Sequence, residues 1–306
     1  MSSASTTINE FQQGSGGTFH GTQPFLWSVR RELWEYRSIY VAPLIVAGLT
    51  IVGFVIGAGH VIAKTRSAQF LAPIYIHDAV VGPYDFAAMA LMGVCFLVSL
   101  FYCIETMQGE RRDRSILFWK SLPVSDLTLV LSKMTVPVII LPVITLVLTI
   151  VTHIALLILN VIILRIAGIS SGPLWAHLSF PQMWAMMAYH MLLLHGLWFA
   201  PVYAWMLLVS AWARRLALLW AVIPYIAIGV LEKLTFHSSQ FGHWMMHHFG
   251  GAPGADAYPG NDMAMHAWMH LSFGQVLFNQ SLWVGLILAA VFLFLAARIR
   301  RSRGPI

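Results

Sequence analysis

Histidine and methionine side chains gather in one segment of the chain, residues 235–275. His243 and His247 are four residues apart, as are His266 and His270, so a helix would place each pair on one face. Paired imidazoles bind transition metals, and methionine thioethers add the soft ligands that copper(I) prefers. The predicted ligands of such a copper site are His243, Met245, His247, His248, His266, Met269 and His270.

Two other interpretations of this segment stay open. Amphipathic helices on a membrane surface can carry His and Met only as packing residues. Alternatively, H-x-x-x-H-H at 243–248 and H-x-x-x-H at 266–270 resemble the histidine boxes of membrane di-iron desaturases and hydroxylases. Those boxes face the cytosol and include a third box. Here the charge pattern described below places the segment outside, and the remaining histidines include several that are scattered singly.

A second group of chemically active residues lies in the segment 108–135. Five charged residues, Glu110 to Arg114, precede an amphipathic stretch whose apolar positions are Ile116, Leu117, Trp119 and Leu122. Pro123 begins a turn, and Ser125 has the residue type of a helix N-cap. This pattern predicts a short helix parallel to the membrane, suited to docking a soluble partner. The alternative is a basic loop that only fixes topology.

Four polar residues interrupt the apolar segments, where such residues are costly and mark candidate pathways. They are Glu105, His153, His190 and His195. Each could line a translocation pathway, or each histidine could instead bond to a backbone carbonyl of a neighbouring helix. Glu105 has a further alternative, an ion pair with Arg111 or Arg112.

The composition shows which elements must position these residues. Of 306 residues, 58% are hydrophobic and 10% are charged, and the mean hydropathy is +0.74. An ordinary soluble chain is about 25% charged, so we predict an all-α polytopic membrane protein. Its six expected spans are 39–62, 84–107, 136–164, 183–212, 216–234 and 276–297.

Residues outside the spans complete the expected layout. The polar, Gly/Ser-rich residues 1–23 predict a disordered tail, and residues 24–306 a single membrane domain. Residues 24–37 alternate apolar and charged positions at helical spacing, which is typical of an amphipathic helix at the membrane surface. Because Pro137 and Pro142 interrupt the third apolar run, we expect an interfacial helix before a kinked crossing.

Lysine and arginine set the orientation, since cytoplasmic segments carry the excess. With both termini inside, fourteen of the 18 basic residues are cytoplasmic; the four outside are Lys64, Arg66, Arg165 and Lys233. Because the basic residues lie at the ends of apolar segments, the basic pI of about 9.5 indicates topology and not nucleic-acid binding. No G-x-x-x-x-G-K-[ST] phosphate loop occurs, so the chain has no ATPase site of that type.

The order of residues in the charged loop resembles a known family. Glu110, the arginines after it, Ser115-Ile116-Leu117, Leu122-Pro123-Val124-Ser125 and Lys133 are similar to the coupling-helix region of bacterial ATP-binding cassette type-2 exporter permeases. The resemblance extends to Leu33-Trp34-Glu35, to the six-span layout and to the basic C-terminal tail. The segment 235–275 departs from it, because it is longer and richer in His and Met than the corresponding family segment.

The resemblance implies a transport subunit in a bacterial inner membrane that is not itself an enzyme. Its partners would be a cytosolic ATPase, which binds ATP and Mg²⁺, and a second permease copy or paralogue. A groove on the ATPase would hold the coupling residues Glu110, Arg111, Arg112, Arg114, Leu117, Trp119 and Pro123. The remaining class of function is a membrane scaffold or sensor whose basic loop recruits a cytosolic protein without transport.

Overall fold

The computed structural model describes residues 23–68, 73–121, 124–172, 175, 178–240, 242 and 277–303. Within these ranges the chain is all-α, with no β-strand, which confirms the predicted fold class. The expected N-terminal tail, Pro123 and most of the segment 235–275 lie outside the described residues.

Helices of very unequal length follow one another along the chain. In order they are α2 (Gln23–Glu35), α3 (Ser38–Ile56), α4 (Ala58–Ala68), α5 (Pro73–Arg112), α6 (Ser115–Ser121), α7 (Asp126–Thr135), the π-helix η1 (Val136–Ile140), α8 (Leu141–Ile166), α10 (Phe180–Tyr189), the π-helix η2 (His190–Trp198), α11 (Ala200–Trp212), α12 (Ala217–Phe236) and α16 (Gln280–Ser302).

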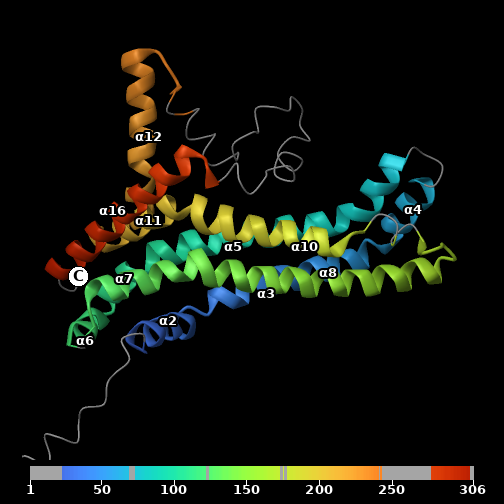
Figure 1. The fold of residues 1–306 in the computed structure, drawn as a ribbon, viewed down its shortest axis with the longest axis horizontal. Helices are drawn as coiled ribbons and strands as arrows, with labels where there is room; N and C mark the ends of the chain where they lie inside the picture. The colour runs from blue at the N-terminus through green and yellow to red at the C-terminus, as the bar shows by residue number, and fades with distance from the viewer. Residues whose placement is uncertain are drawn as a thin grey trace, which may run out of the picture.

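The long helix α5 organises the bundle. It packs against α3, α8 and α11, and α11 in turn packs along α16. Figure 1 shows α3, α5, α8 and α10 running along one axis, with α2, α6, α7 and the end of α16 at one end and α4 at the other. Buried Tyr102, Met107, Tyr203 and Leu207 belong to the main core, and a smaller core near α4 includes Tyr84.

Five helices are long and apolar enough to cross a membrane, and a bent pair adds a sixth. The bent pair is Phe180–Trp198 with Ala200–Trp212, which meet at 45°. These correspond in order to the six predicted spans. The helix ends differ from the approximate predicted boundaries at the first two spans: the first helix ends at Ile56, and the second candidate span begins at Val80.

The third predicted span lies within one continuous helical stretch, Asp126–Ile166, made of α7, η1 and α8. The sequence predicted a separate interfacial helix in front of the crossing. No break separates α7 from α8, because Pro137, which has no N–H to donate, is accommodated in the π-turn η1; the interfacial position of α7 stays a prediction. The start was predicted correctly, since the Ser125 side chain accepts a hydrogen bond from the Thr128 N–H.

Two π-helical segments, η1 and η2, face each other in the middle of the bundle. Gly196 of η2 allows this close approach. A Cβ atom built on it would lie 2.9 Å from the backbone oxygen of Val138 in η1, closer than real Cβ atoms come to such an oxygen. A glycine is therefore required where the two spans cross.

Helix α12 stands apart from the other spans. Figure 1 shows it projecting away from the bundle beyond the α11 turn. Leu216, the residue before it, has a left-handed backbone with φ of 54°. Most of its apolar side chains are exposed, among them Leu219, Ile223 and Ile226, so this helix presents its surface to lipid or to another chain.

Candidate functional site

Buried charges from four helices meet at the end of the bundle that carries α2 and α6. The acidic residues are Glu32 of α2 and Glu110 of α5, each about 1% exposed, and the buried bases are Lys133 of α7 and Arg300 of α16. We call these four, with Arg31 and Asp126 at the edge, the ion cluster. Buried charges are rare unless they are paired, so we first describe how each carboxylate is satisfied.

Glu32 accepts from two cations and two hydroxyl groups. Its Oε1 lies 2.8 Å from Lys133 Nζ and 2.5 Å from an Arg31 guanidinium nitrogen. Its Oε2 accepts from the Tyr102 hydroxyl at 2.9 Å and from Thr106 at 3.1 Å. Burial alone would raise the pKa of Glu32, but the attraction of Lys133 and Arg31 outweighs it, so the pKa is lowered and the carboxylate stays charged.

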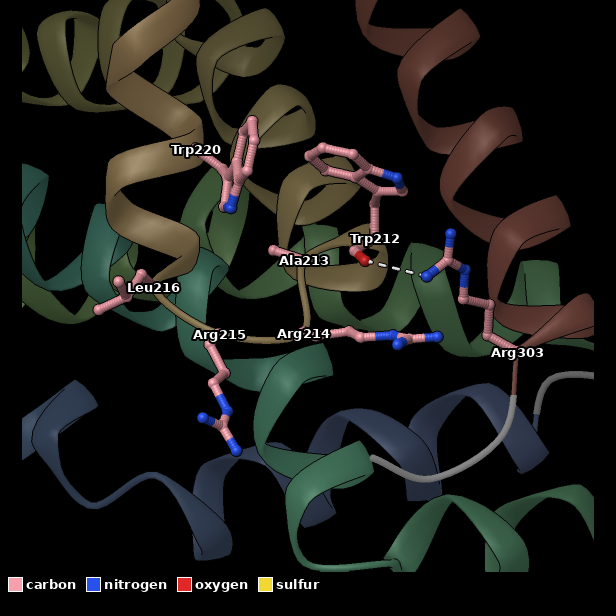
Figure 2. A pocket seen from close by; sticks show the side chains of 7 residues that line it. All are labelled: Trp212, Ala213, Arg214, Arg215, Leu216, Trp220 and Arg303. Carbon is pink, nitrogen blue, oxygen red and sulfur yellow. Dashed lines mark hydrogen bonds between the residues drawn. The ribbon is translucent and has the colours of Figure 1, made fainter.

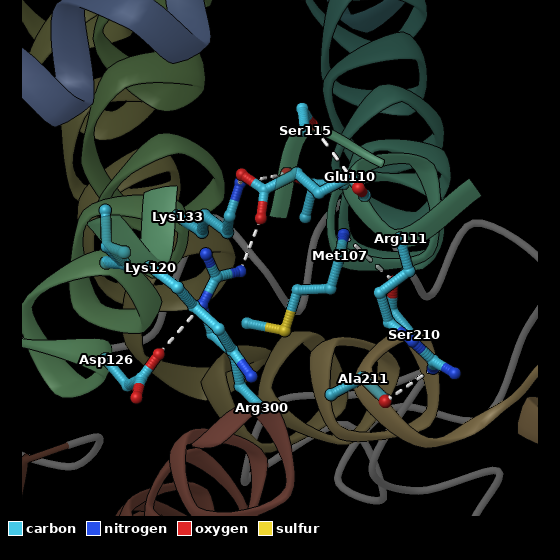
Figure 3. Close-up of polar contacts among 12 residues, drawn as sticks. Met107, Glu110, Arg111, Ser115, Lys120, Asp126, Lys133, Ser210, Ala211 and Arg300 are labelled. Atoms are coloured by element: carbon cyan, nitrogen blue, oxygen red, sulfur yellow. Dashed lines mark hydrogen bonds and ion pairs between the residues drawn. The ribbon is translucent and has the colours of Figure 1, made fainter. Parts of the chain in front are cut away.

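Glu110 is shared by three bases from three other helices. Its carboxylate lies 2.9 Å from Lys133 Nζ and 2.5 Å from Arg31, and it also pairs with Arg300. Arg300 reaches Asp126 at 3.2 Å as well (Figure 3). Glu35 adds a further carboxylate 3.3 Å from Arg31, and Glu32 and Glu110 each have cations within ion-pair distance, which is the condition under which a buried ionic group is tolerated. The cluster therefore ties α2, α5, α7 and α16 together.

The short helix α6 is attached to this cluster on three sides. At its start the Ser115 hydroxyl donates to the Glu110 backbone oxygen at 3.3 Å. Near its end Lys120 Nζ donates to the Arg303 backbone oxygen at 2.7 Å. Between them the Trp119 ring lies under the guanidinium of Arg31, 3.8 Å from its centroid, a cation–π contact. Movement of α6 would thus pull on α2, α5 and α16.

The outer side of α6 carries exposed apolar residues. Leu117 is 55% exposed and Phe118 58% exposed. Arg112 and Arg114, just before α6, are exposed too, and the left-handed backbone of Arg114 (φ of 59°) turns the chain from α5 into α6. Exposed apolar residues beside exposed arginines form a surface of the kind that binds another protein.

The predicted coupling residues therefore divide into two groups. Arg112, Arg114 and Leu117 are accessible, and Trp119 is partly covered by Arg31. Glu110 and Arg111 are buried inside the chain. The Arg111 guanidinium donates to the backbone oxygens of Ala211 at 2.8 Å and Ala213 at 3.2 Å, so it joins α5 to α11. The contact of any of these residues with an ATPase stays a prediction.

The predicted pathway residues have different immediate partners. Nε2 of His153 lies 3.0 Å from the Tyr84 backbone oxygen of the neighbouring helix α5, and the Trp184 indole donates to its Nδ1 at 3.3 Å. Nδ1 of His190 lies 2.8 Å from the Met186 backbone oxygen. His153 therefore has the backbone partner on a neighbouring helix that was the alternative to a transport role, whereas Met186 lies one turn before His190 in the same span.

His195 and Glu105 lie in different surroundings. The buried His195 ring packs edge-on against Phe96 and Phe199, with centroids 6.4 Å and 5.6 Å apart. Glu105 is exposed and pairs with Arg112 at 3.2 Å, as one of the sequence alternatives proposed. A role of these four residues in transport stays a prediction.

The seven predicted copper ligands all lie outside the described residues, so the structure says nothing about them. Within the part of the chain that is described, no group of three or more His, Cys, Asp or Glu side chains could hold a metal ion. The copper site stays a prediction from sequence.

Sequence reasoning missed the ion cluster as a unit, although a signal was present. Glu32 lies on the apolar face of α2, three residues after Val29 and four before Tyr36. Arg300 likewise follows Leu293 and Ala296 at helical spacing. A charge within an apolar stripe requires a buried partner, but the stripe alone does not say which helix supplies it.

Comparison of the chain with models of known protein families, with curated proteins and with solved structures gave no match. The resemblance to exporter permeases therefore rests on the residues of the charged loop and on the layout of the spans.

Proposed function

We propose that this chain is the membrane-spanning subunit of an ATP-driven exporter of the ATP-binding cassette type-2 class. In this proposal α6 is the helix that docks into a separate cytosolic ATPase, which binds ATP and Mg²⁺. The subunit works with a second permease copy or paralogue in a bacterial inner membrane, with both of its termini in the cytoplasm.

The observation that carries the proposal is the construction of α6. Its exposed Leu117 and Phe118 offer an apolar anchor, and such residues at the centre of an interface commonly provide most of the binding energy. The opposite side is held by Arg31, through Trp119, and by the backbone of Glu110, through Ser115. Because this docking surface is attached to the membrane helices, movement of a bound ATPase would move those helices.

The ion cluster would transmit movement of α6 to the membrane helices. Glu110 connects α5 with α2, α7 and α16, so these helices move with α6 as one unit. Helix α5 runs from this end of the bundle to the far end, where it packs against α4 and α8. When the ATPase subunits close, the force on α6 would therefore tilt α5 and change the distance between α5 and the helices packed against it.

Co-purification tests the proposal. Tagged protein extracted from its native membrane should retain a nucleotide-binding protein and ATP hydrolysis. The double variant Leu117→Ala/Phe118→Ala should lower that retention about tenfold or more, because it removes the apolar anchor. The matched control is Leu97→Ala/Phe101→Ala, which removes the same two residue types from the exposed mid-span surface of α5 and should retain the partner.

Two outcomes would reject the proposal. Wild-type protein that retains a partner without nucleotide-binding activity would indicate a scaffold or sensor. Equal retention by both double variants would show that α6 is not the docking element. Trp119→Ala should also reduce retention, through loss of the Arg31 contact that positions α6.

A further inference from the structure

A pocket of about 780 Å³ opens where α11 gives way to α12, next to the last turn of α16. Its volume is within the range of small-ligand sites. The residues that line it are Trp212, Ala213, Arg214, Arg215, Leu216, Trp220 and Arg303 (Figure 2). It is separate from the ion cluster, and the docking of α6 does not use it.

The pocket is strongly basic, and within the described residues its arginines have no acidic partner. Arg214, Arg215 and Arg303 line it, and Arg111 lies behind its wall, within electrostatic range of Arg214 and Arg303. In the part of the chain that the structure describes, no carboxylate lies within 4.0 Å of any of these four. The carboxylates of the ion cluster nearby are paired with cations of that cluster, so this local positive charge favours binding of an anion.

Two of the arginines extend along the same side of the pocket (Figure 2). In Figure 2, Arg214 extends toward the side of Arg303, whereas Arg215 points the other way. The Arg303 guanidinium lies 3.5 Å from the Trp212 backbone oxygen, a long hydrogen bond at the wall of the pocket. Two guanidinium groups that line one pocket are suited to phosphate, which accepts paired N–H donors.

The other side of the pocket is apolar. Trp212 and Trp220 pack edge-on with ring centroids 5.1 Å apart, and both are exposed. From Trp220 the exposed apolar face of α12 continues through Ile223 and Ile226. A free anion would gain nothing from this surface, but an acyl chain attached to the anion would lie along it.

From this arrangement we infer that the pocket binds the phosphate headgroup of an anionic phospholipid, with Arg214 and Arg303 as the phosphate ligands and α12 as the track for the acyl chains. Basic pockets between membrane helices on the cytoplasmic side are typical sites for such lipids. The Lys and Arg distribution predicts that this end of the bundle is cytoplasmic. The inference does not depend on the proposed exporter function.

Native mass spectrometry of the full chain in detergent tests the inference, with dioleoylphosphatidylglycerol and dioleoylphosphatidylcholine as probes. Wild-type protein should bind the anionic lipid at least about tenfold more tightly than the neutral one. Arg214→Gln/Arg303→Gln should lose about tenfold in affinity for the anionic lipid. Arg298→Gln/Arg301→Gln, which removes the same charge from the end of α16 outside the pocket, should change it less than about twofold.

A third variant and a competitor separate the remaining possibilities. Arg214→Lys/Arg303→Lys keeps the charge but not the paired donors, and should fall between the wild type and the glutamine variant. Equal losses in the pocket and control variants, or equal binding of the two lipids, would overturn the inference. So would displacement of the anionic lipid by millimolar inorganic phosphate, because the pocket would then bind a soluble anion.

Discussion

Glu110 receives cations from three helices, Arg31 of α2, Lys133 of α7 and Arg300 of α16. Removing one charge from such a buried set leaves the others unpaired, and this costs more than the pair itself contributes. The same helix offers a comparison, because Glu105 pairs with Arg112 while both stay exposed. Location, and not the type of residue, decides what each carboxylate does for stability.

The first prediction follows from this contrast. Glu110→Gln should destabilise the protein by about 3–5 kcal/mol, because three cations lose their common carboxylate. Glu105→Gln should leave the melting temperature unchanged, since exposed pairs contribute little. Thermal unfolding in detergent measures both. Equal melting temperatures for the two variants would show that the ion cluster does not stabilise the bundle.

The second prediction concerns pH at Glu32. Its pKa is lowered from an ordinary value of 4.5 by Lys133 and Arg31, which outweigh its burial. The stability that it contributes is therefore present above pH 4.5 and is lost as pH falls through the lower, folded-state pKa. Between pH 6 and pH 3.5, the melting temperature of the Glu32→Gln variant should fall by less than that of the wild type.

A neighbouring carboxylate supplies the control, because its pKa moves the other way. Burial raises the pKa of Glu35 more than Arg31 lowers it. Its contribution to stability is therefore present below its ordinary value of 4.5 and lost as pH rises through the folded-state pKa. Glu35→Gln should make the loss of stability in acid steeper. The same pH response in both variants would contradict this assignment of charges.

At the scale of elements, helix boundaries depend on a few residues. Ser125 was recognisable as an N-cap, and it starts α7 as expected. The π-turn at Pro137 was not recognisable, because a proline in an apolar run predicts either a kink or an end. The difference matters, because η1 continues the third span and brings Val138 against Gly196.

The third prediction tests that crossing. Gly196→Ala places a Cβ atom 2.9 Å from the Val138 backbone oxygen, so one helix must shift, at a cost of about 1–3 kcal/mol. The control is Gly48→Ala in α3, where a Cβ atom would meet nothing within 4 Å. Its melting temperature should stay the same or rise, since alanine favours helix. Equal effects would mean that the two π-helical segments do not press together.

At the scale of the whole molecule, the segments predicted to be cytoplasmic do meet at one end. There Glu110 of α5 pairs with both Arg31 and Arg300. Arg111, also of α5, donates a hydrogen bond to the Ala211 backbone oxygen of α11. Apolar length and basic residues therefore predicted the fold class and which segments lie together. The pairing inside the ion cluster could not be predicted. A charged residue in an apolar stripe requires a partner of opposite charge, but it does not identify the helix that carries this partner.

The fourth prediction concerns which side of the membrane this end occupies. Single cysteines at Ser125 and Ser302 should be shielded from an impermeant thiol reagent added outside intact cells, and one at Ser238 should react. Both native cysteines, Cys95 and Cys103, are buried and should give no background. Labelling of the cysteine at position 125 from outside would show that the orientation is the opposite of the predicted one. Helix α6 would then lie on the side of the membrane away from a cytosolic ATPase.

Photo-crosslinking from α6 tests the central claim most directly, that this helix docks a separate ATPase. Benzoylphenylalanine at position 118 should capture a nucleotide-binding protein in intact cells, identified by mass spectrometry of the adduct. The same group at position 101, an equally exposed phenylalanine in the middle of α5, should not. An adduct at 118 that contains no nucleotide-binding protein, or the same protein captured from both positions, would contradict the account.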